Sequence, residues 1–228
     1  MVAKTPTAAK KIERPKASTA STSPALRADD SWISPAEVME RVFDNPAKIP
    51  GFGFAVVRRK LGKFTNTAPD YARAKLQPRR PTAADRPSDG SWPITARQWE
   101  VLLPTGVSDD YLVPELLYTR YQQELQEDRP ELLLSLTLHF DRPLPRHEMI
   151  MLARMFAVDH LVRARRLSTL FVLHQPGDLG SLNAPHVHLL ATARQQWPSG
   201  WGGYVTEVLR DDGQQLLFDE WRELRDRW

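Results

Sequence analysis

LFVLHQPGDLGSLNAPHVHLLATAR, residues 170–194, contains two apolar runs of the β type on either side of a loop rich in glycine, asparagine, aspartate and proline. Successive side chains of a strand point to opposite faces, so His186 and His188 project to one side while Val187 enters the core. If the two runs are neighbouring strands, His174 at the end of the first run can reach the same side. The sequence therefore predicts three converging imidazoles.

Three imidazoles without a fourth protein ligand leave open coordination positions, which a catalytic metal requires. An H-x-H pair on a strand also arises by chance on ordinary surfaces, but a third histidine at the mouth of the preceding strand favours a metal site. The remaining histidines, His139, His147 and His160, are expected to be ordinary surface or edge residues.

Several pieces of the chain follow one another in an order known from a protein family. These pieces are SLTLHFDRPLP, HEMIMLARMFAVDHLVRARR, LFVLH, GDLGSLNAPHVHLLATAR and SGWGG, and EVLLPTG precedes them. The segment from about Leu132 to Tyr204 thereby resembles the relaxase domain of plasmid mobilization proteins of the MobA/MobL type, which are HUH endonucleases. The ordered succession is specific, whereas any single piece is not.

This resemblance implies an enzyme that nicks one DNA strand at a plasmid transfer origin. A tyrosine attacks the scissile phosphate and remains on the 5′ end, and His174, His186 and His188 hold a divalent ion, usually magnesium or manganese. The ion would neutralise charge that builds on the phosphate. Ligand chemistry alone favours zinc or manganese, because imidazole is softer than magnesium prefers. The implied partners are single-stranded DNA near the nick and accessory mobilization proteins.

Tyr71, in TNTAPDYARAKL, matches the family position of the attacking tyrosine best. A predicted strand, GFGFAVVRRK, and a glycine-containing loop precede it, as in the family. Pro69 departs from the pattern because it bars an uninterrupted helix, although it can occupy a first helical turn. Tyr118 and Tyr121 are expected to pack or decorate a helix.

A second departure concerns the strand 132–140, where many relatives carry acidic residues and this chain has Ser135 and Thr137. A carboxylate there could orient a histidine or accept the tyrosine proton. Asp178 and Asn183 in the histidine loop could support the site instead, or could simply form the turn.

Two alternatives to an active relaxase therefore stay open. The first is a relaxase-derived DNA-binding accessory protein that no longer cuts. The second is a zinc hydrolase unrelated to DNA, which needs a general-base carboxylate near the site; Asp178 or a distant glutamate would have to serve.

Composition is compatible with a cytoplasmic protein, which is the expected location. The chain has 228 residues, no cysteine and a formal net charge of only +3, which does not by itself demand a nucleic acid partner. No stretch approaches the roughly 18 apolar residues of a membrane span, and the N-terminus lacks the apolar core of a secretory signal.

Two segments are predicted to be flexible, and four residues are candidate DNA contacts. Residues 1–30 are rich in Ala, Thr, Ser, Pro and Lys and are predicted to form a disordered basic tail. Residues 77–93 are predicted to form a mobile loop rich in proline and arginine, in which Arg79 and Arg80 could contact phosphates. Trp197 and Trp201 could stack a base, or could anchor the glycine-rich turn between them.

The remaining residues, 31–228, are predicted to form one relaxase-like α+β domain. Five β-type runs fit the fold that the resemblance implies, an antiparallel five-stranded sheet covered by helices on one face and open to metal and DNA on the other. The predicted strands lie near 52–58, 98–103, 132–140, 169–174 and 186–193, and the predicted helices near 34–43, 112–126, 146–165 and 214–227.

Overall fold

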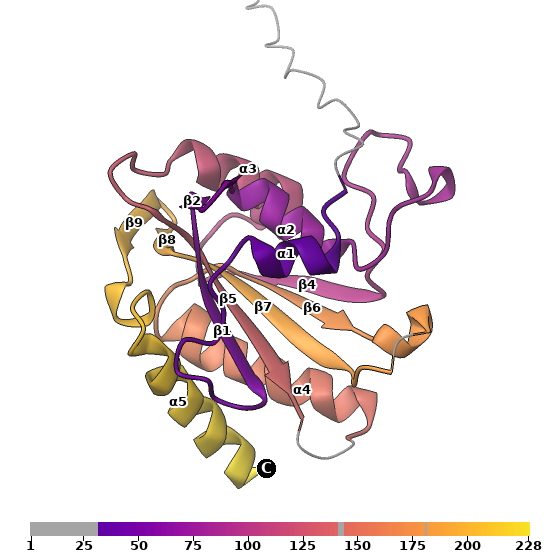
Figure 1. Ribbon diagram of the computed structural model, residues 1–228. Helices are drawn as coiled ribbons and strands as arrows, with labels where there is room; N and C mark the ends of the chain where they lie inside the picture. Colours follow the sequence, from indigo (N-terminus) through magenta and orange to yellow (C-terminus); the bar gives the residue numbers. More distant parts are fainter. Residues whose placement is uncertain (1–31, 141–143, 181) are drawn as a thin grey trace, which may run out of the picture.

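The computed structural model describes residues 32–140, 144–180 and 182–228 (Figure 1). The predicted tail, residues 1–30, lies outside the described residues. The helices are α1 (Pro35–Glu40), α2 (Ala68–Leu76), α3 (Pro114–Gln123), α4 (Arg146–Phe156) and α5 (Gly213–Arg227). The strands are β1 (Phe52–Arg58), β2 (Lys60–Leu61), β3 (Phe64–Thr65), β4 (Gln98–Leu102), β5 (Glu131–His139), β6 (Thr169–His174), β7 (His186–Thr192), β8 (Arg194–Trp197) and β9 (Gly200–Tyr204).

A five-stranded sheet with the order β1-β5-β7-β6-β4 forms the centre of the fold, and every neighbouring pair is antiparallel. This confirms the predicted α+β class and the predicted sheet. In the register, His186 on β7 lies opposite His139 on β5 and opposite His174 on β6. Histidines on three adjacent strands therefore meet at one end of the sheet.

Helices lie on both faces of the sheet, with α4 and α5 on one face and α1, α2 and α3 on the other (Figure 1). The sequence predicts helices on one face only. The second layer forms because β5 is almost continuously buried, from Leu132 to Leu136, and so presents apolar side chains to both sides. The α1–α3 layer covers only part of its face, and the histidines lie where this cover ends.

The two helices near the histidines, α1 and α2, each begin with a capping side chain and a proline in the first turn. Ser34 caps α1 by accepting a hydrogen bond from the backbone N–H of Glu37 at 3.2 Å, and Thr67 caps α2 in the same way from Asp70 at 3.2 Å. Pro69 lies in the first turn of α2, where its missing N–H costs no helical hydrogen bond. Tyr71 therefore lies on a regular helix.

Two predicted helices differ from the observed ones, one in where it begins and the other in its geometry. The predicted helix 112–126 begins only at Pro114, after a short 3₁₀ turn, because proline favours the first helical position. The predicted helix 146–165 changes from α to π geometry at Ala157. Interruptions of this kind depend on hydrogen bonding that an apolar stripe does not report.

The segment 77–93 contains a 3₁₀ turn, Ala83–Asp85. Within it, Arg79 forms an ion pair with Asp85 at 2.6 Å, and the amide of Gln77 donates to the carbonyl of Pro93 at 2.7 Å. These bonds close the segment on itself. Its mobility stays a prediction.

Candidate metal centre

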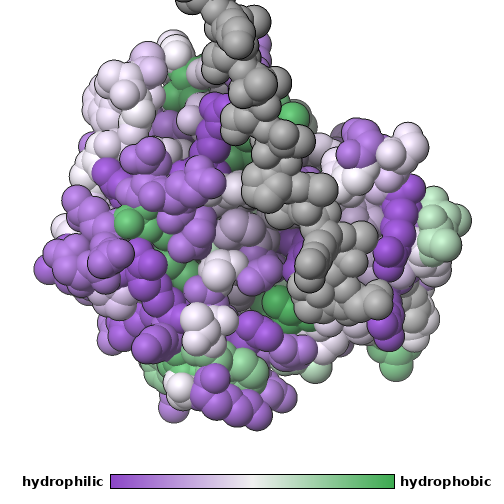
Figure 2. All heavy atoms as spheres, turned by 90° about the horizontal axis from the view of Figure 1, so that it is seen from above, coloured by the Kyte–Doolittle hydropathy of each residue, from purple (hydrophilic) through white to green (hydrophobic). Residues whose placement is uncertain are grey.

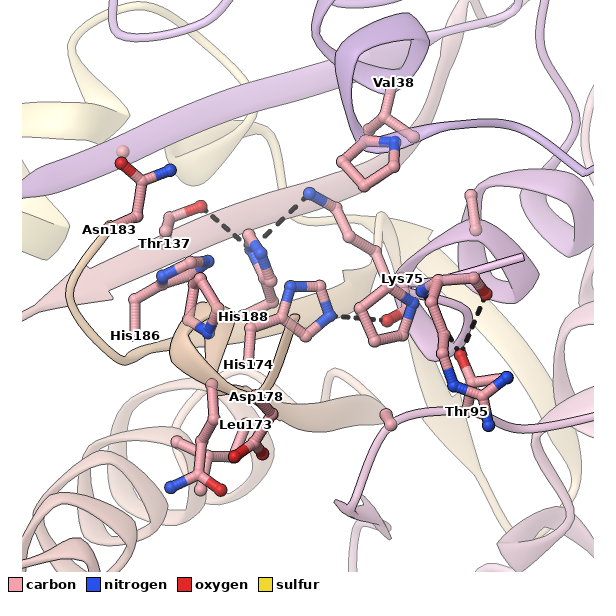
Figure 3. Close-up of a pocket in the computed structure, with 18 of the residues that line it drawn as sticks. Val38, Lys75, Thr95, Thr137, Leu173, His174, Asp178, Asn183, His186 and His188 are labelled. Carbon is pink, nitrogen blue, oxygen red and sulfur yellow. Dashed lines mark hydrogen bonds between the residues drawn. The ribbon is translucent and has the colours of Figure 1, made fainter. Parts of the chain in front are cut away.

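His174, at the end of β6, and His186 and His188, on β7, come together in the structure (Figure 3). Each offers one ring nitrogen, and these three atoms lie within 4.8 Å of one another. The antiparallel register places His174 opposite His186, and alternation along β7 places His188 on the same face. The three side chains predicted from the sequence therefore form a group that could hold a metal ion.

Each of the three imidazoles has one nitrogen engaged by a neighbouring oxygen. The Nε2 atom of His174 lies 2.7 Å from the carbonyl oxygen of Lys75, and the Nδ1 atom of His186 lies 3.0 Å from the carbonyl oxygen of Ala184. A carbonyl can only accept, so these nitrogens donate and the opposite nitrogen of each ring keeps its lone pair. Metal-binding histidines in proteins usually have this arrangement.

His188 is oriented by a hydroxyl. Its Nδ1 atom lies 3.0 Å from the Oγ1 atom of Thr137, which can accept the Nδ1 proton and leave Nε2 free as a ligand. A carboxylate at this position was expected to be the better orienting group, but the structure places the threonine hydroxyl there. Thr137 has room because Gly53 lies opposite it on β1, where an added Cβ would approach the Cβ of Thr137 to 2.9 Å.

We expect Thr137→Val to lower metal affinity by about 10- to 100-fold, the range found when an orienting partner of a metal-binding histidine is removed. Valine keeps the shape of threonine but cannot accept the His188 proton. Isothermal titration with Mn²⁺ and Zn²⁺ measures the effect. Thr95→Val, a change at another hydroxyl of the same cavity, is the matched control. Equal affinities in wild type and Thr137→Val would contradict the assigned role.

Burial keeps the three histidines in the neutral form that binds metals. Burial lowers the pKa of His174 to about 4, although the hydrogen bond to the Lys75 carbonyl acts in the opposite direction. Burial also lowers the pKa of His186 and, more strongly, that of His188. Since a lowered pKa favours the neutral imidazole, all three can offer lone pairs at neutral pH.

The centre lies in a cavity of about 640 Å³. Its lining includes three basic side chains, Lys75, Arg79 and Arg97, besides the imidazoles. An apolar part of the lining comes from α1 and from the segments that follow α2. The lining also includes Asp44 and Asp178, so the cationic groups are partly compensated, and a bound metal ion would be needed to make the cavity suit an anionic ligand.

Lys75, Asp44 and Arg97 are residues of this site that were not predicted from the sequence. The Nζ atom of Lys75 lies 3.5 Å from the Nδ1 atom of His188, and burial lowers the pKa of Lys75 to about 8, while the charge of Asp44 raises it. Lys75 follows Tyr71 by four residues on α2, and this i, i+4 spacing was an available signal that they share a helix face. No comparable signal existed for Asp44, whose position depends on a single bridge to Ala55 on β1.

His139 also belongs to the cavity. It lies opposite His186 across β5 and β7, and the two ring centres are 5.2 Å apart. His139 is exposed at the end of β5, as expected of a surface or edge residue, and it also lines the cavity. Burial lowers its pKa as well, and the charge of Asp44 acts in the opposite direction.

Tyr71 is close to the centre but is not among the residues that line the cavity. Its side chain is packed in the core and is 3% exposed, and the Nζ atom of Lys75 lies 5.5 Å from its ring centre. Burial raises the pKa of its hydroxyl above the usual value, and a hydrogen bond with Ser135 partly opposes that effect. The role of Tyr71 as the attacking residue stays a prediction.

Two other tyrosines have the packing role that was expected. The hydroxyl of Tyr118 donates to the carbonyl of Leu190 at 2.7 Å, and that of Tyr121 donates to the carbonyl of Leu132 at 2.7 Å. Both side chains are fully buried between α3 and the sheet. Neither is available to a ligand in the cavity.

The remaining predicted site residues fall into two groups. Asp178, Asn183 and Arg79 line the cavity, where Asp178 forms an ion pair with Arg97 at 3.1 Å (Figure 3). Arg80 is exposed and is not part of the lining. The roles predicted for these four residues stay predictions.

Trp197 and Trp201 lie far from the histidines. They belong to β8 and β9, which follow the last residue of β7, whereas His186 is the first residue of β7. The seven residues of β7 span roughly 20 Å. Trp201 packs against Tyr121 with ring centres 4.7 Å apart, and the guanidinium of Arg166 lies 3.9 Å from the ring centre of Trp197. These contacts support the anchoring interpretation, and contact with DNA at the histidine centre is not supported.

The fold and the site define an α+β protein with a three-histidine candidate metal centre in a cavity lined by charged residues of both signs. No protein-family model and no curated protein matches the chain. One solved structure, described as "Molecular Basis of Vancomycin Resistance Transfer in Staphylococcus aureus", is similar at 17% identity and a TM-score of 0.49, over 59% of this chain and 70% of that chain. A likeness of this strength leaves the function to be argued from the site.

Among the described residues, no helix has the length and apolar character needed to cross a membrane.

Proposed function

We propose that this chain is a metal-dependent DNA strand transferase of the relaxase type. The observation that carries the proposal is the grouping of His174, His186 and His188, each with one nitrogen tied to an oxygen and the other left as a ligand. Three neutral nitrogen ligands and open positions fit a catalytic ion better than a structural one.

The cavity around the histidines supports a phosphodiester as the ligand. An ion bound there would polarise the phosphate and help to neutralise charge that develops on it during attack. Lys75 and Arg97 add positive charge on the same cavity, and Asp44 and Asp178 are their nearby counter-charges. The proposal includes magnesium, manganese and zinc as candidate ions, and titration of the protein with each ion would measure which one the centre prefers.

Tyr71 is the proposed nucleophile. Its phenolic oxygen would bond to phosphorus while the bond from phosphorus to the 3′ oxygen breaks. The phenolic proton would leave for a nearby acceptor, and Asp44 is the carboxylate whose charge acts on Tyr71. The 3′ oxygen would take a proton from water, and the hydroxide left behind would combine with the proton released by the phenol, which completes the free 3′ hydroxyl. Because the hydroxyl is buried, attack also requires a movement that exposes it to the cavity.

A second candidate function is a DNA-binding protein of the same fold that does not cut. The burial of Tyr71 and its hydrogen bond with Ser135 favour this candidate, since a nucleophile must reach its substrate. It requires the cavity but no attack by the phenol. The two candidates differ in one product, the covalent protein–DNA adduct.

A nicking assay tests the first candidate. Supercoiled plasmid that carries the cognate transfer origin is expected to become open circular in the presence of Mn²⁺ and to stay supercoiled with a chelator. Binding of single-stranded DNA is expected to weaken as salt rises, because phosphate contacts release counterions. An affinity that does not change with salt would contradict the proposal that DNA is the ligand. Nicking that proceeds equally with the chelator would contradict the proposal that the reaction requires a metal ion.

A further inference from the structure

The cavity has two unlike parts, and the histidine centre accounts for only one of them. One part carries the imidazoles and Lys75. The other is a wall formed by Pro35, Val38 and Met39 of α1, which we call the α1 wall. Figure 3 shows Val38 extending from α1 above Lys75 and the histidines. The α1 wall offers only aliphatic carbon and a thioether to the space that the cationic groups border.

The α1 wall is fixed to the layer beneath it. Before the helix, the indole N–H of Trp32 donates to the carbonyl of Gln77 at 3.0 Å. After the helix, the amide of Asn66 donates to the carbonyl of Arg41 at 2.9 Å. Val38 is buried against the core, whereas Met39 is 53% exposed. The wall is therefore anchored on both sides, and Met39 is the side chain that a ligand would cover.

The cavity is larger than a phosphate needs. A volume of about 640 Å³ lies in the range of pockets that hold whole small molecules. On the face seen in Figure 2, hydrophobic residues form separate patches among mostly hydrophilic ones. The α1 wall lines the same cavity as Lys75 and the histidines, and this position limits the chemistry of its occupant.

We propose that the α1 wall receives one unpaired nucleobase of the strand whose phosphate lies at the histidine centre. This inference rests on the proposed function. A base inside a duplex is stacked and paired, so only a single strand or an extruded base can turn its ring onto such a wall. Contact with aliphatic carbon and with the Met39 sulfur gains dispersion and sulfur–aromatic energy without selecting one base. The α1 wall thus makes the site selective for single strands.

Fluorescence anisotropy with two probes in Mn²⁺ tests the α1 wall. The probes are a labelled thymidine homo-oligomer and an abasic oligomer of equal length and charge. The wild-type protein is expected to prefer the thymidine oligomer. Met39→Ala is expected to reduce that preference by roughly fivefold, at the low end of base-contact effects because the wall is not aromatic. Met151→Ala on α4, also an exposed methionine at 42%, is the matched control and is expected to keep the preference.

Any of three outcomes would overturn the proposal that the α1 wall binds a nucleobase. The wild-type protein could bind both oligomers equally, Met39→Ala could keep the full preference, or a thymidine–adenine duplex could bind as tightly as the single strand. In each case metal-dependent binding of the backbone would survive, so the proposed function would stand without the wall. If the wild-type protein bound neither oligomer, the proposed function would fail together with the wall.

Discussion

Replacing His188 with alanine is expected to abolish metal binding and metal-dependent nicking. His188 is the most buried of the three candidate ligands, and its loss leaves two half-buried imidazoles. A bound ion contributes several kcal/mol to stabilising charge in such a transition state. At 1.36 kcal/mol per factor of ten, the nicking rate should fall by about 10³-fold or more. Plasmid nicking in Mn²⁺ and calorimetric metal titration measure the two effects, and His186→Ala is expected to behave alike.

His147→Ala is the matched control, because His147 is a highly exposed histidine whose Nε2 atom lies 3.9 Å from the carboxylate of its neighbour Glu148. It should nick and bind metal as the wild-type protein does. If His188→Ala kept full metal affinity while remaining folded, the centre would not be the metal site. If it lost metal but nicked normally, the metal would have no part in the reaction.

Replacing Tyr71 with phenylalanine is expected to abolish the covalent link between protein and nicked DNA. Phenylalanine keeps the ring in the core and removes only the hydroxyl, together with its hydrogen bond to Ser135, which costs about 1 kcal/mol of stability. Metal affinity should not change, since Tyr71 is not one of the grouped ligands. Denaturing electrophoresis of labelled DNA after reaction with Mn²⁺ detects the adduct.

Tyr118→Phe is the matched control, because that hydroxyl is equally buried and bonds only within the fold. It should still form the adduct. An adduct that persists in Tyr71→Phe shows that another residue attacks. A wild-type protein that binds DNA but never forms an adduct supports the second candidate, the DNA-binding protein that does not cut.

Lys75 is a buried charged group beside the histidines, and its charge affects the ions and ligands that the cavity can bind. Its Nζ atom lies 3.5 Å from Nδ1 of His188, the nitrogen that also contacts Thr137. Because an Nδ1–H that donates to Thr137 cannot accept from an ammonium, Lys75 acts on His188 as a nearby charge and not as a hydrogen-bond donor. Asp44 is the carboxylate whose charge acts on Lys75, and burial raises the pKa of Asp44 while Lys75 lowers it. The candidate metal centre therefore lies beside a partly compensated charge pair, so an anionic ligand is favoured over a second cation.

The histidine centre could be predicted from the sequence because its geometry is local. The alternation of β7 fixes His186 and His188 on one face, and the loop between β6 and β7 returns the chain beside itself, which places His174 opposite. The start of α2 could also be predicted, because Thr67 as N-cap and Pro69 in the first turn favour the beginning of a helix in any tertiary context. Local hydrogen bonding and side-chain period are encoded within a few residues.

What surrounds the centre depended on segments far apart in the chain. The second helical layer, the burial of Tyr71, and the meeting of Asp44, Lys75 and His139 with the three histidines follow from how β1, α2 and β5 pack together. Strand order and helix placement are set by burying apolar surface over the whole domain, and a local pattern carries no record of which face a distant segment will cover. The sequence by itself determined which residues can bind a metal; only the tertiary structure decided whether the tyrosine near them can reach a ligand.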